Sequence, residues 1–285
     1  MCIKIRNLVF TMIAVAVLFS AVACSSNIEK PVSVDVPDVT GIFNVEILDI
    51  GKADAIILTS LNHTVLIDCG EKGDGDEVLD CLYEKNIDEI DYMFITHFDK
   101  DHVGGAKKIL NNMQVKKIIT PDYEGTNNEY TDFIEAIKEN NLSSSVLENE
   151  MSFVLDDVLY EIYPPQKNSY EEGDNDYSIV IKTTHGENTF LFAGDAEEER
   201  LAELDIQMDL DSDFLKVPHH GNYNENTKKF IQEVSPLYAV ITCSEKNPAS
   251  QNVIDLLNSC NCSVFLTQNG DVSAESDGKT IQITQ

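Results

Sequence analysis

The sequence predicts an α+β fold in which two mixed β-sheets pack face to face and helices cover both outer sides. Short runs rich in Val, Ile and Phe alternate with polar stretches of helical length. Covered sheets of this kind bury the apolar faces of both element types. The chain has 285 residues, of which 42% are hydrophobic, so it can form one large core. No linker composition follows residue 42, and residues 43–285 are therefore expected to form a single domain.

The elements follow in a regular order along the chain. The apolar runs predict strands at Phe43–Asp49, Ala55–Thr59, Thr64–Ile67, Tyr92–Thr96, Lys117–Thr120, Val158–Tyr163, Ser178–Thr183, Thr189–Ala193, Phe214–Val217, Leu237–Thr242, Ser263–Thr267 and Thr280–Thr284. The polar stretches predict helices at Glu77–Lys85, Gly105–Asn112, Tyr130–Asn140, Glu197–Leu204, Asn226–Glu233 and Asn252–Ser259. An early meander of strands opens the first half, and the second half repeats the plan of strands, helix, strand, helix and strand.

The first 23 residues predict a targeting segment. Lys4 and Arg6 precede an apolar stretch over Leu8–Ala23, and small residues then lead into Cys24, which resembles a bacterial lipoprotein signal with a lipidated cysteine. An ordinary secretory signal cut after Ala23, or an uncleaved anchor, are the alternatives; the stretch is short for a full membrane span. We expect a signal at 1–23, a tether at 24–42, and an extracytoplasmic domain anchored to a bacterial membrane through lipid on Cys24.

The remaining cysteines do not suggest a metal site. Cys260-x-Cys262 is not a zinc-knuckle spacing, and no second pair matches it. Cys69, Cys81 and Cys243 are, like that pair, expected to be mostly buried small apolar residues, although a Cys69–Cys81 bridge remains an alternative in an oxidising compartment.

The charge balance limits the classes of partner. The chain carries 50 acidic and 20 basic residues, for a formal net charge of -30. Such an excess repels polyanions over long distances and argues against a broad surface of Lys and Arg that tracks phosphates. A local metal site that holds one phosphate remains compatible with it.

The segment from His97 to His102 carries the strongest chemical signal. His97, Asp99, Asp101 and His102 lie within six residues, between an apolar run and Gly104-Gly105, as in a strand, a polar loop and a helix. Imidazole and carboxylate groups suit zinc, manganese or iron. Without a cation, the crowded groups would face like-charge repulsion and desolvation. The alternative is a solvated acidic loop whose histidines form local hydrogen bonds.

Other polar clusters also stand where expected strands end. Asp68, Asp195 and the pair His219-His220 each follow an apolar run, so they can converge with His97 on one cleft. Simpler alternatives are a helix N-cap for Asp195 and a surface loop for the histidine pair. Asp54 fits a turn residue or a support for the site equally well. His63 and His185 are expected to be structural.

Five motifs together resemble a known family. They are Leu48-Asp49-Ile50-Gly51-Lys52-Ala53-Asp54-Ala55, Val65-Leu66-Ile67-Asp68-Cys69-Gly70, Thr96-His97-Phe98-Asp99-Lys100-Asp101-His102-Val103-Gly104-Gly105, Phe190-Leu191-Phe192-Ala193-Gly194-Asp195 and Leu215-Lys216-Val217-Pro218-His219-His220-Gly221. In this order they resemble the metallo-β-lactamase superfamily of αββα metallohydrolases. Within it, the chain is similar to the extracytoplasmic hydrolase-like domain of ComEC-type competence proteins, as a free-standing version without the membrane channel.

The resemblance implies a role for each matching residue. His97 and Asp99 match the first metal position, and Asp101 with His102 match the second. Asp195 would bridge both metals, and His220 matches the last histidine ligand. His219 would be a substrate or supporting group, and Asp68 a buried support for the metal loop.

Three positions depart from the family pattern. The histidine of the third motif should fall near Asp174–Ser178 and is missing, so that a carboxylate or an amide would have to replace it. Asn247-Pro248 stands where relatives resemble His-Pro. Lys52-Ala53-Asp54 replaces the usual Gln-Gly-Asp. These departures favour lower activity or a changed substrate.

The expected function is metal-assisted hydrolysis. Two divalent ions, zinc or manganese, would hold a hydroxide that Asp101 and Asp195 orient, while His219 or His220 polarises the leaving group. We expect Asp101 and His219 as catalytic residues and a small-molecule or nucleic-acid phosphodiester, such as extracytoplasmic DNA or nucleotides, as substrate. The alternatives are a lactam, lactone or thioester hydrolase and a catalytically weak, lipid-anchored binding domain. No protein partner can be identified from the sequence.

Overall fold

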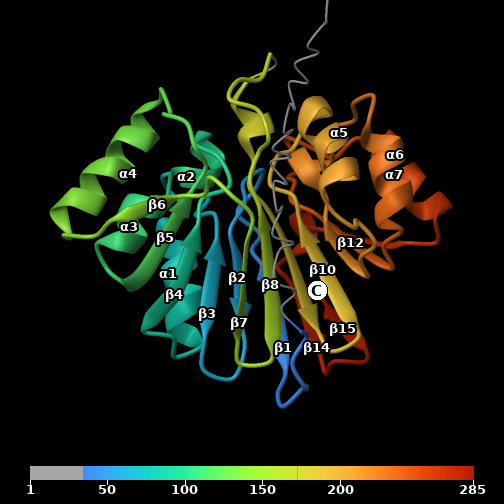
Figure 1. Cartoon of the computed structure of the whole chain (residues 1–285), viewed down its shortest axis with the longest axis horizontal. Coiled ribbons are helices and arrows are strands. Elements are labelled where there is room, and N and C mark those ends of the chain that lie inside the picture. Colours follow the sequence, from blue (N-terminus) through green and yellow to red (C-terminus); the bar gives the residue numbers. More distant parts are fainter. Residues whose placement is uncertain (1–34, 172) are drawn as a thin grey trace, which may run out of the picture. The chain divides into compact units, whose positions relative to one another are not determined.

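The computed structural model describes residues 35–171 and 173–285 as two sheets between two layers of helices (Figure 1). The expected signal segment and Cys24 lie outside the described residues. Residues 35–42 of the expected tether are described, and their last residues contact the domain: the backbone N–H groups of Thr40 and Gly41 donate to Asp157 Oδ2 at 2.5 and 2.7 Å. The αββα arrangement confirms the fold class expected from the sequence.

The first sheet joins both ends of the described chain. Its eight strands within the described residues follow the order β15-β14-β1-β2-β3-β4-β5-β6. Their bounds are β1 Phe43–Ile47, β2 Ile56–Thr59, β3 Thr64–Ile67, β4 Glu89–Phe94, β5 Gln114–Thr120, β6 Ser144–Val146, β14 Val272–Ser276 and β15 Ile281–Thr284. Strands β3 to β6 run parallel to one another, whereas β1, β2, β14 and β15 pair in antiparallel fashion.

The second sheet has a similar plan. Its seven strands in the described part follow the order β13-β12-β11-β10-β9-β8-β7. Their bounds are β7 Met151–Leu155, β8 Val158–Tyr163, β9 Val180–His185, β10 Asn188–Phe192, β11 Phe214–Lys216, β12 Tyr238–Ile241 and β13 Ser263–Leu266. Strands β10 to β13 are parallel, and β7, β8 and β9 add antiparallel hairpins.

The helices lie outside the two sheets, with α1–α4 on the first and α5–α7 on the second (Figure 1). Their bounds are α1 Gly75–Glu84, α2 Lys100–Val103, α3 Ala106–Leu110, α4 Asn128–Glu139, α5 Glu198–Gln207, α6 Thr227–Val234 and α7 Gln251–Ser259; the 3₁₀ turns are η1 Asp174–Tyr177, η2 Pro218–Gly221 and η3 Thr267–Asn269. A central core that includes Phe43, Phe190 and Phe214 fills the space between the sheets, and a further core lies under each helical layer.

Parallel strands bring all their carboxyl ends to one edge, which we call the upper end because it is uppermost in Figure 1. Strands β3, β4, β10, β11 and β12 end there. The opposite, lower end carries the hairpin turns β2–β3, β7–β8, β9–β10 and β14–β15. Ligand sites in open α/β sheets lie outside the carboxyl ends of the strands, so the upper end is the place to look for a site.

Three strands were not expected from the sequence. They are β6, β7 and β14. Strand β14 reads Val-Ser-Ala-Glu-Ser and has few apolar residues, so its strand state depends on pairing with β1 over the register Phe43↔Ser276 to Ile47↔Val272. The expected helix Gly105–Asn112 is present as α3, Ala106–Leu110, and a further short helix that was not expected, α2, begins before it inside the His-Asp motif.

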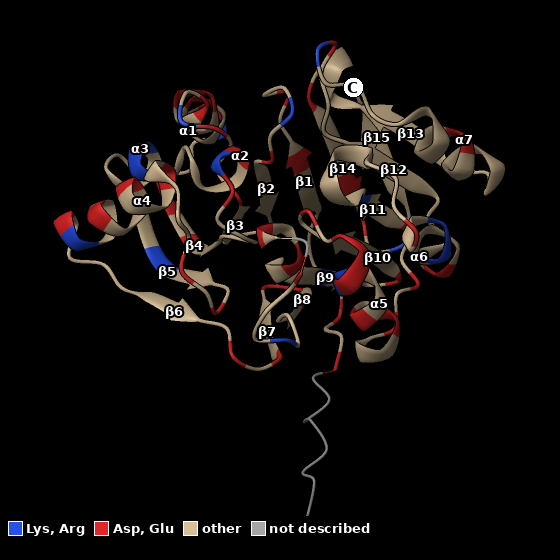
Figure 2. Cartoon of the chain, turned by 90° about the horizontal axis from the view of Figure 1, so that it is seen from above, with Lys and Arg blue, Asp and Glu red and all other residues tan. Residues whose placement is uncertain are grey.

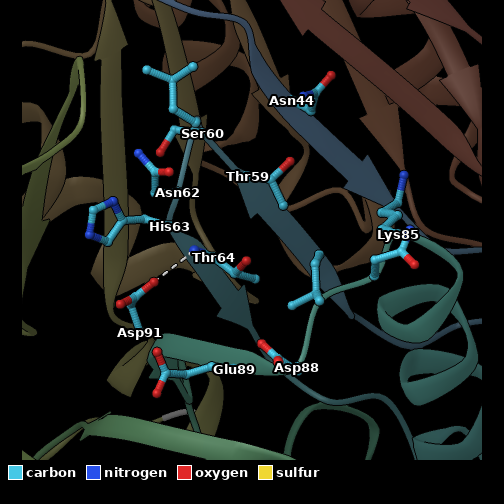
Figure 3. Close-up of a pocket in the computed structure, with 13 residues that line it drawn as sticks. Asn44, Thr59, Ser60, Asn62, His63, Thr64, Lys85, Asp88, Glu89 and Asp91 are labelled. Carbon is cyan, nitrogen blue, oxygen red and sulfur yellow. Dashed lines mark hydrogen bonds between the residues drawn. The ribbon is translucent and has the colours of Figure 1, made fainter.

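The lower end has a hollow of about 540 Å³ that does not contain the expected site residues. Figure 3 shows its walls, which come from the β2–β3 turn and the start of β4; the N–H of Thr64 donates to Asp91 there at 2.9 Å. The hollow lies at the amino ends of β3 and β4, away from the His-Asp motif.

Acidic and basic residues are mixed over the outer surface. Figure 2 shows acidic segments on α4 and α5, with basic segments on α3 and β5 among them. All five cysteines of the described residues are free, and Cys69, Cys243 and Cys262 are buried as expected. Within residues 35–171 and 173–285, no helix has the length and apolar character needed to cross a membrane.

Candidate metal centre

Three histidines from two distant segments of the chain meet at the upper end. His97 follows β4, His102 lies in α2, and His220 lies in η2 after β11. His97 and His102 have no exposed surface and His220 is 2% exposed. The Nε2 atoms of all three have no hydrogen-bond partner. Buried polar atoms are normally paired, so three such nitrogens in one place call for a further ligand.

Carboxylates from two further positions face these nitrogens. Asp195 Oδ2 lies 3.3 Å from His102 Nε2 and 3.1 Å from His220 Nε2, and Asp101 Oδ2 lies 3.5 Å from His220 Nε2. Two overlapping groups result, His97-His102-Asp195 and Asp101-His102-His220, with ligand atoms in each within 4.8 Å of one another. Asp195 reaches both groups, as a bridging carboxylate would. The sequence grouped His102 with Asp101; the structure also places His102 beside His97.

The backbone of η2 turns His220 into the site. His219 and His220 both adopt left-handed φ angles, 47° and 51°, before Gly221 at 74°. Non-glycine residues rarely occupy this region, and runs of them are found mainly where a site demands them. The turn sends the two side chains in different directions. His220 faces Asp195, whereas His219 Nδ1 lies 2.6 Å from Glu197 Oε1.

The buried carboxylate of Asp68 orients two of the histidines. Asp68 Oδ2 accepts from His102 Nδ1 at 2.8 Å and from the Thr96 hydroxyl at 2.7 Å. Because that hydroxyl donates to Asp68, it accepts from His97 Nδ1, 3.1 Å away. The network therefore keeps the proton of each neutral ring on Nδ1 and leaves each Nε2 lone pair free toward the centre.

The buried carboxylate of Asp54 does the same for His220. His220 Nδ1 lies 2.8 Å from the Thr242 hydroxyl, which donates to Asp54 Oδ1 at 2.7 Å. The ammonium group of Lys216 forms an ion pair with Asp54 Oδ2 and lies 3.8 Å from Asp195 Oδ1. Lys216 has no exposed surface, so this pair is a buried charge balance behind the histidines. Asp54 thus supports the site, one of the two roles that the sequence left open.

Burial and neighbouring charges shift the pKa values of the clustered side chains. Burial lowers the pKa of His97 well below its usual value, and the neighbouring His102 adds to this. Burial also opposes protonation of His102, but Asp195 and Asp68 raise the pKa of His102 well above its usual value. His220 and His102 hold the pKa of Asp195 well below its usual value although burial raises it. Against the effect of burial, Asp195 also raises the pKa of His220, so the carboxylate favours positive charge at this place, as a divalent cation would supply.

Two of the expected site residues lie at the edge of the cluster. Asp99 Oδ2 is 3.8 Å from His97 Nε2, and its side chain is 42% exposed. His219 Nε2 faces the amide nitrogens of Asn222 at 3.0 Å and Asn175 at 3.5 Å. The roles of Asp99 as a metal ligand and of His219 as a catalytic residue stay predictions.

The region of the missing third histidine is occupied by other polar groups. Ser178 Oγ lies 3.5 Å from His97 Nδ1 and accepts from the N–H of Asp195 at 3.1 Å. Asp176 turns away and accepts from the first N–H groups of α5, those of Glu197 and Arg200, so it caps that helix in place of Asp195. The buried Oδ1 of Asn175 has no hydrogen-bond partner, and neither has Oδ2 of Asp176.

Backbone hydrogen bonds fix three of the loops against one another. Asp54 N–H donates to Asp101 O at 3.0 Å, Gly70 N–H to Asp54 O at 2.8 Å, and Cys69 N–H to His102 O at 2.7 Å. A Cβ on Gly105 would lie 2.1 Å from Cys69 O, so only glycine permits this approach. The loop that carries Asp101 and His102 is therefore fixed against the two loops that precede it in the chain.

Lys216, Thr242 and Asn175 belong to the site without having been assigned a role from the sequence. Lys216 could have been found, because a charged residue inside the apolar strand Phe214–Val217 needs a buried partner. Thr242 and Asn175 carry no comparable signal, since threonine is common in strands and asparagine in turns.

A family model for the metallo-beta-lactamase superfamily matches residues 49–244, which include every expected metal ligand. The chain belongs to the metallo-beta-lactamase superfamily. Members of this superfamily are in general metal-dependent hydrolases that bind divalent metal ions, often two. The family assignment agrees with the resemblance expected from the motifs.

Curated relatives and solved structures extend the comparison. This chain is 26% identical in sequence to ComE operon protein 3 of Bacillus subtilis, over 80% of this chain and 32% of that protein. It is 26% identical to Recombination protein 2 of Haemophilus influenzae over 72% of this chain and 25% of that protein. The chain thus spans about a third or less of the length of these relatives.

Solved structures share the fold. The metallo-beta-lactamase fold protein YhfI of Bacillus subtilis superposes on this chain with a TM-score of 0.59 at 12% identity, covering 83% of this chain and 100% of YhfI. A mutant of CmlA beta-hydroxylase has a TM-score of 0.52 at 12% identity, covering 81% of this chain and 53% of CmlA.

The residues present fit divalent cations. Three unpartnered Nε2 atoms and the carboxylates of Asp195 and Asp101 form a donor set of imidazole and carboxylate, which suits zinc, manganese or iron. Each ring is oriented from behind by a carboxylate or a hydroxyl, as metal-binding histidines usually are. These residues are therefore a candidate site for divalent metal.

Proposed function

We propose that the protein is an extracytoplasmic, metal-dependent phosphodiesterase that acts on DNA or nucleotides. The observation that carries the proposal is the buried set of three unpartnered histidine nitrogens around Asp195 at the upper end. The similarity to ComE operon protein 3 and to Recombination protein 2 supports a substrate related to DNA.

The side chains divide the work between holding metal and handling the substrate. His97, His102, His220, Asp195 and Asp101 would hold divalent zinc or manganese. Such cations, when bound, act as Lewis acids that activate water and neutralise charge on the attacked group. Asp68 and Asp54 keep the ring protons on Nδ1, so that the Nε2 lone pairs stay available.

His219 is the residue that we propose to contact the leaving group. Its ring is 15% exposed beside the cluster, and Glu197 at 2.6 Å holds Nδ1. A hydrogen bond of this kind keeps a proton on Nδ1 and fixes the ring, which leaves Nε2 on the side of Asn175 and Asn222. The free Oδ1 of Asn175 lies in the same place and could accept a hydrogen bond from the substrate.

The place of action is part of the proposal. Lys4, Arg6, the apolar stretch Leu8–Ala23 and Cys24 support export and lipid anchoring to a bacterial membrane. Metabolic labelling with a radioactive fatty acid tests this point: we expect label in the wild-type chain and none in Cys24→Ala. Label in both would contradict lipidation of Cys24.

The activity is tested with a chromogenic phosphodiester. Purified protein supplied with Mn²⁺ or Zn²⁺ should hydrolyse bis(p-nitrophenyl) phosphate. His97→Ala should lower kcat/KM by at least about a hundredfold, because a lost ligand removes most of the metal's stabilisation of charge. His63→Ala is the matched control, since His63 lies at the lower end and pairs with Asp156 at 3.0 Å.

Two outcomes would overturn this function. Equal rates for wild type and His97→Ala would show that the centre does not catalyse the cleavage. Hydrolysis of a lactam, lactone or thioester without phosphodiester cleavage would assign the same centre to the other substrate class. Metal binding with no hydrolysis in any of these assays would favour a binding domain, to which the missing third-motif histidine points.

A further inference from the structure

A second pocket opens directly beside the candidate metal centre. It has a volume of about 630 Å³ and is lined on one side by the loop after β1 and on the other by the loop after β12. Asp101, a member of the metal cluster, forms part of its wall. A molecule whose reacting group lies at the metal centre can therefore extend into this pocket.

The pocket gathers cations in a chain that is otherwise strongly acidic. Lys52, Lys100 and Lys246 line it, together with the three acids Glu71, Asp101 and Glu245, so the two signs are equal in number there, whereas the whole chain has a formal net charge of -30. Lys100 forms an ion pair with Glu71 at 3.3 Å. Lys52 and Lys246 have no ion pair or hydrogen bond with any side chain in residues 35–171 and 173–285.

Lys138, Lys228 and Lys279 also lack a side-chain partner in the described residues, whereas Lys72, Lys107 and Lys108 each contact an aspartate within 3.1 Å. What sets Lys52 and Lys246 apart is that both line the pocket that Asp101 shares with the metal cluster. Lys52 is half-buried next to Gly51, which has a left-handed φ of 79°. Lys246 stands in a turn closed by reciprocal backbone hydrogen bonds of 3.1 Å between Ser244 and Asn247. Both lysines thus stand on defined loops, and their ammonium groups have no side-chain partner within the described residues.

We propose that this pocket binds a second phosphate group of the substrate, joined to the phosphodiester at the metal centre, and that Lys52 and Lys246 receive it. The inference rests on the proposed phosphodiesterase function and adds a substrate class to it: chains of at least two phosphates rather than isolated diesters. Two of the positions that depart from the family motifs, Lys52 and Asn247, line this same pocket.

The net negative charge of the chain restricts phosphate binding to a small region of the surface. The net negative field of the chain repels a polyanion at a distance. Within a Debye length of about 8 Å at physiological salt, however, the nearest charges decide the interaction. Two free ammonium groups beside bound divalent metal make the upper end the favourable place for two linked phosphates, with Glu245 as the one unpaired acid on the wall.

Matched substrates that differ by one phosphate test the inference. One pair is thymidine 5′-(p-nitrophenyl phosphate) with and without a 3′-phosphate; the other is thymidine 3′-(p-nitrophenyl phosphate) with and without a 5′-phosphate. The wild type should prefer the member with the extra phosphate in at least one pair. The double variant Lys52→Ala/Lys246→Ala should lower this preference, the ratio of kcat/KM values, about tenfold. Lys279→Ala, an exposed lysine at the lower end, should leave the ratio as it is.

A binding measurement separates this inference from the proposed activity. Calorimetry of the metal-loaded protein with thymidine 3′,5′-bisphosphate and with each thymidine monophosphate needs no turnover. The bisphosphate should bind more tightly to the wild type, and the double variant should lose about tenfold of that advantage. If the wild type cleaves no phosphodiester, the proposed function fails, and this binding ratio alone decides the pocket. Two results would overturn the inference. One is a wild type that shows no preference for the extra phosphate, and the other is a double variant that keeps the same preference as the wild type.

Discussion

Both ends of the sandwich bury histidines beside aspartates, but the number of imidazole rings around each carboxylate differs. At the lower end, His185 has one carboxylate near it, with Nε2 3.6 Å from Asp157, and its Nδ1 bonds to Ser276 at 2.8 Å. At the upper end, three imidazole rings share Asp195, and their Nδ1 atoms are all occupied from behind.

The difference lies in how many rings face each aspartate. Asp157 Oδ2 accepts from the backbone of Thr40 and Gly41, while its Oδ1 and the Nε2 of the single ring beside it, His185, have no hydrogen-bond partner. Asp195 Oδ1 and the three Nε2 atoms at the upper end remain without hydrogen-bond partners. A lone buried histidine beside a carboxylate is thus a structural pair, whereas several histidines that leave the same nitrogen free around one carboxylate form a metal centre.

The largest expected effect comes from the buried cation of the upper end. Lys216→Met leaves Asp54 buried without its partner and should lower the free energy of unfolding by about 3–5 kcal/mol. The double variant Asp54→Asn/Lys216→Met should recover most of this loss, because neither charge remains. Urea unfolding in EDTA measures both, with Lys279→Met as an exposed control. A single variant as stable as the wild type would show that the pair balances no charge.

The next effect concerns the orientation of the rings. Asp68→Asn keeps the size of the side chain but places an amide donor opposite His102 Nδ1, so the ring proton moves to Nε2. Metal affinity should fall about 10- to 100-fold. Titration calorimetry with Zn²⁺ or Mn²⁺ measures it. Asp157→Asn makes the same chemical change at the lower end and should leave the affinity unchanged; a comparable loss in both variants would remove the distinction between the ends.

The smallest effect is the pH dependence of the lower end. Burial raises the pKa of Asp157, but hydrogen bonds from Thr40 and Gly41 and the charge of His185 outweigh it and lower the pKa below its usual value. A lowered folded pKa adds stability above the unfolded pKa of about 3.9, and this stability is lost as the pH falls through the folded pKa.

Asp157→Asn should therefore cost about 1–3 kcal/mol at neutral pH. The cost should shrink below about pH 4, where the wild-type carboxylate begins to take up its proton. Urea unfolding of both proteins in EDTA across this range measures the difference. A cost that is constant with pH would mean that the carboxylate charge contributes nothing.

Much of the fold could be predicted from the sequence because strands of a covered parallel sheet are marked by runs of apolar residues. Largely buried on both faces, β3, β4, β10 and β11 each contain a short apolar run, such as Val65–Ile67 in β3 and Phe190–Phe192 in β10. Strands β7 and β14 lie outside this parallel core and alternate exposed with less exposed residues, so their state depends on the neighbours they pair with. A single sequence does not display such pairing.

The residues of the candidate site fall into two groups, those that a local sequence pattern indicates and those that only distant contacts bring together. His97, Asp101 and His102 lie within one short motif, and Asp195 with His220 each follow an apolar strand, so local pattern was enough to suggest them. The supports depend on distant contacts, since Thr242 and Asp54 are 188 positions apart and Lys216 is nearly as far from Asp54. Only the packing of the two sheets brings these residues together.

The most direct test of the central claim is an anomalous difference map from crystals grown with Zn²⁺, recorded at the zinc absorption edge. We expect density bound by the upper-end histidines, about 2.0–2.1 Å from the Nε2 atoms of His97, His102 and His220, with Asp195 as a shared ligand. Density at other residues only, or none at all from protein that retains its fold, would contradict the assignment of a metal centre to this chain.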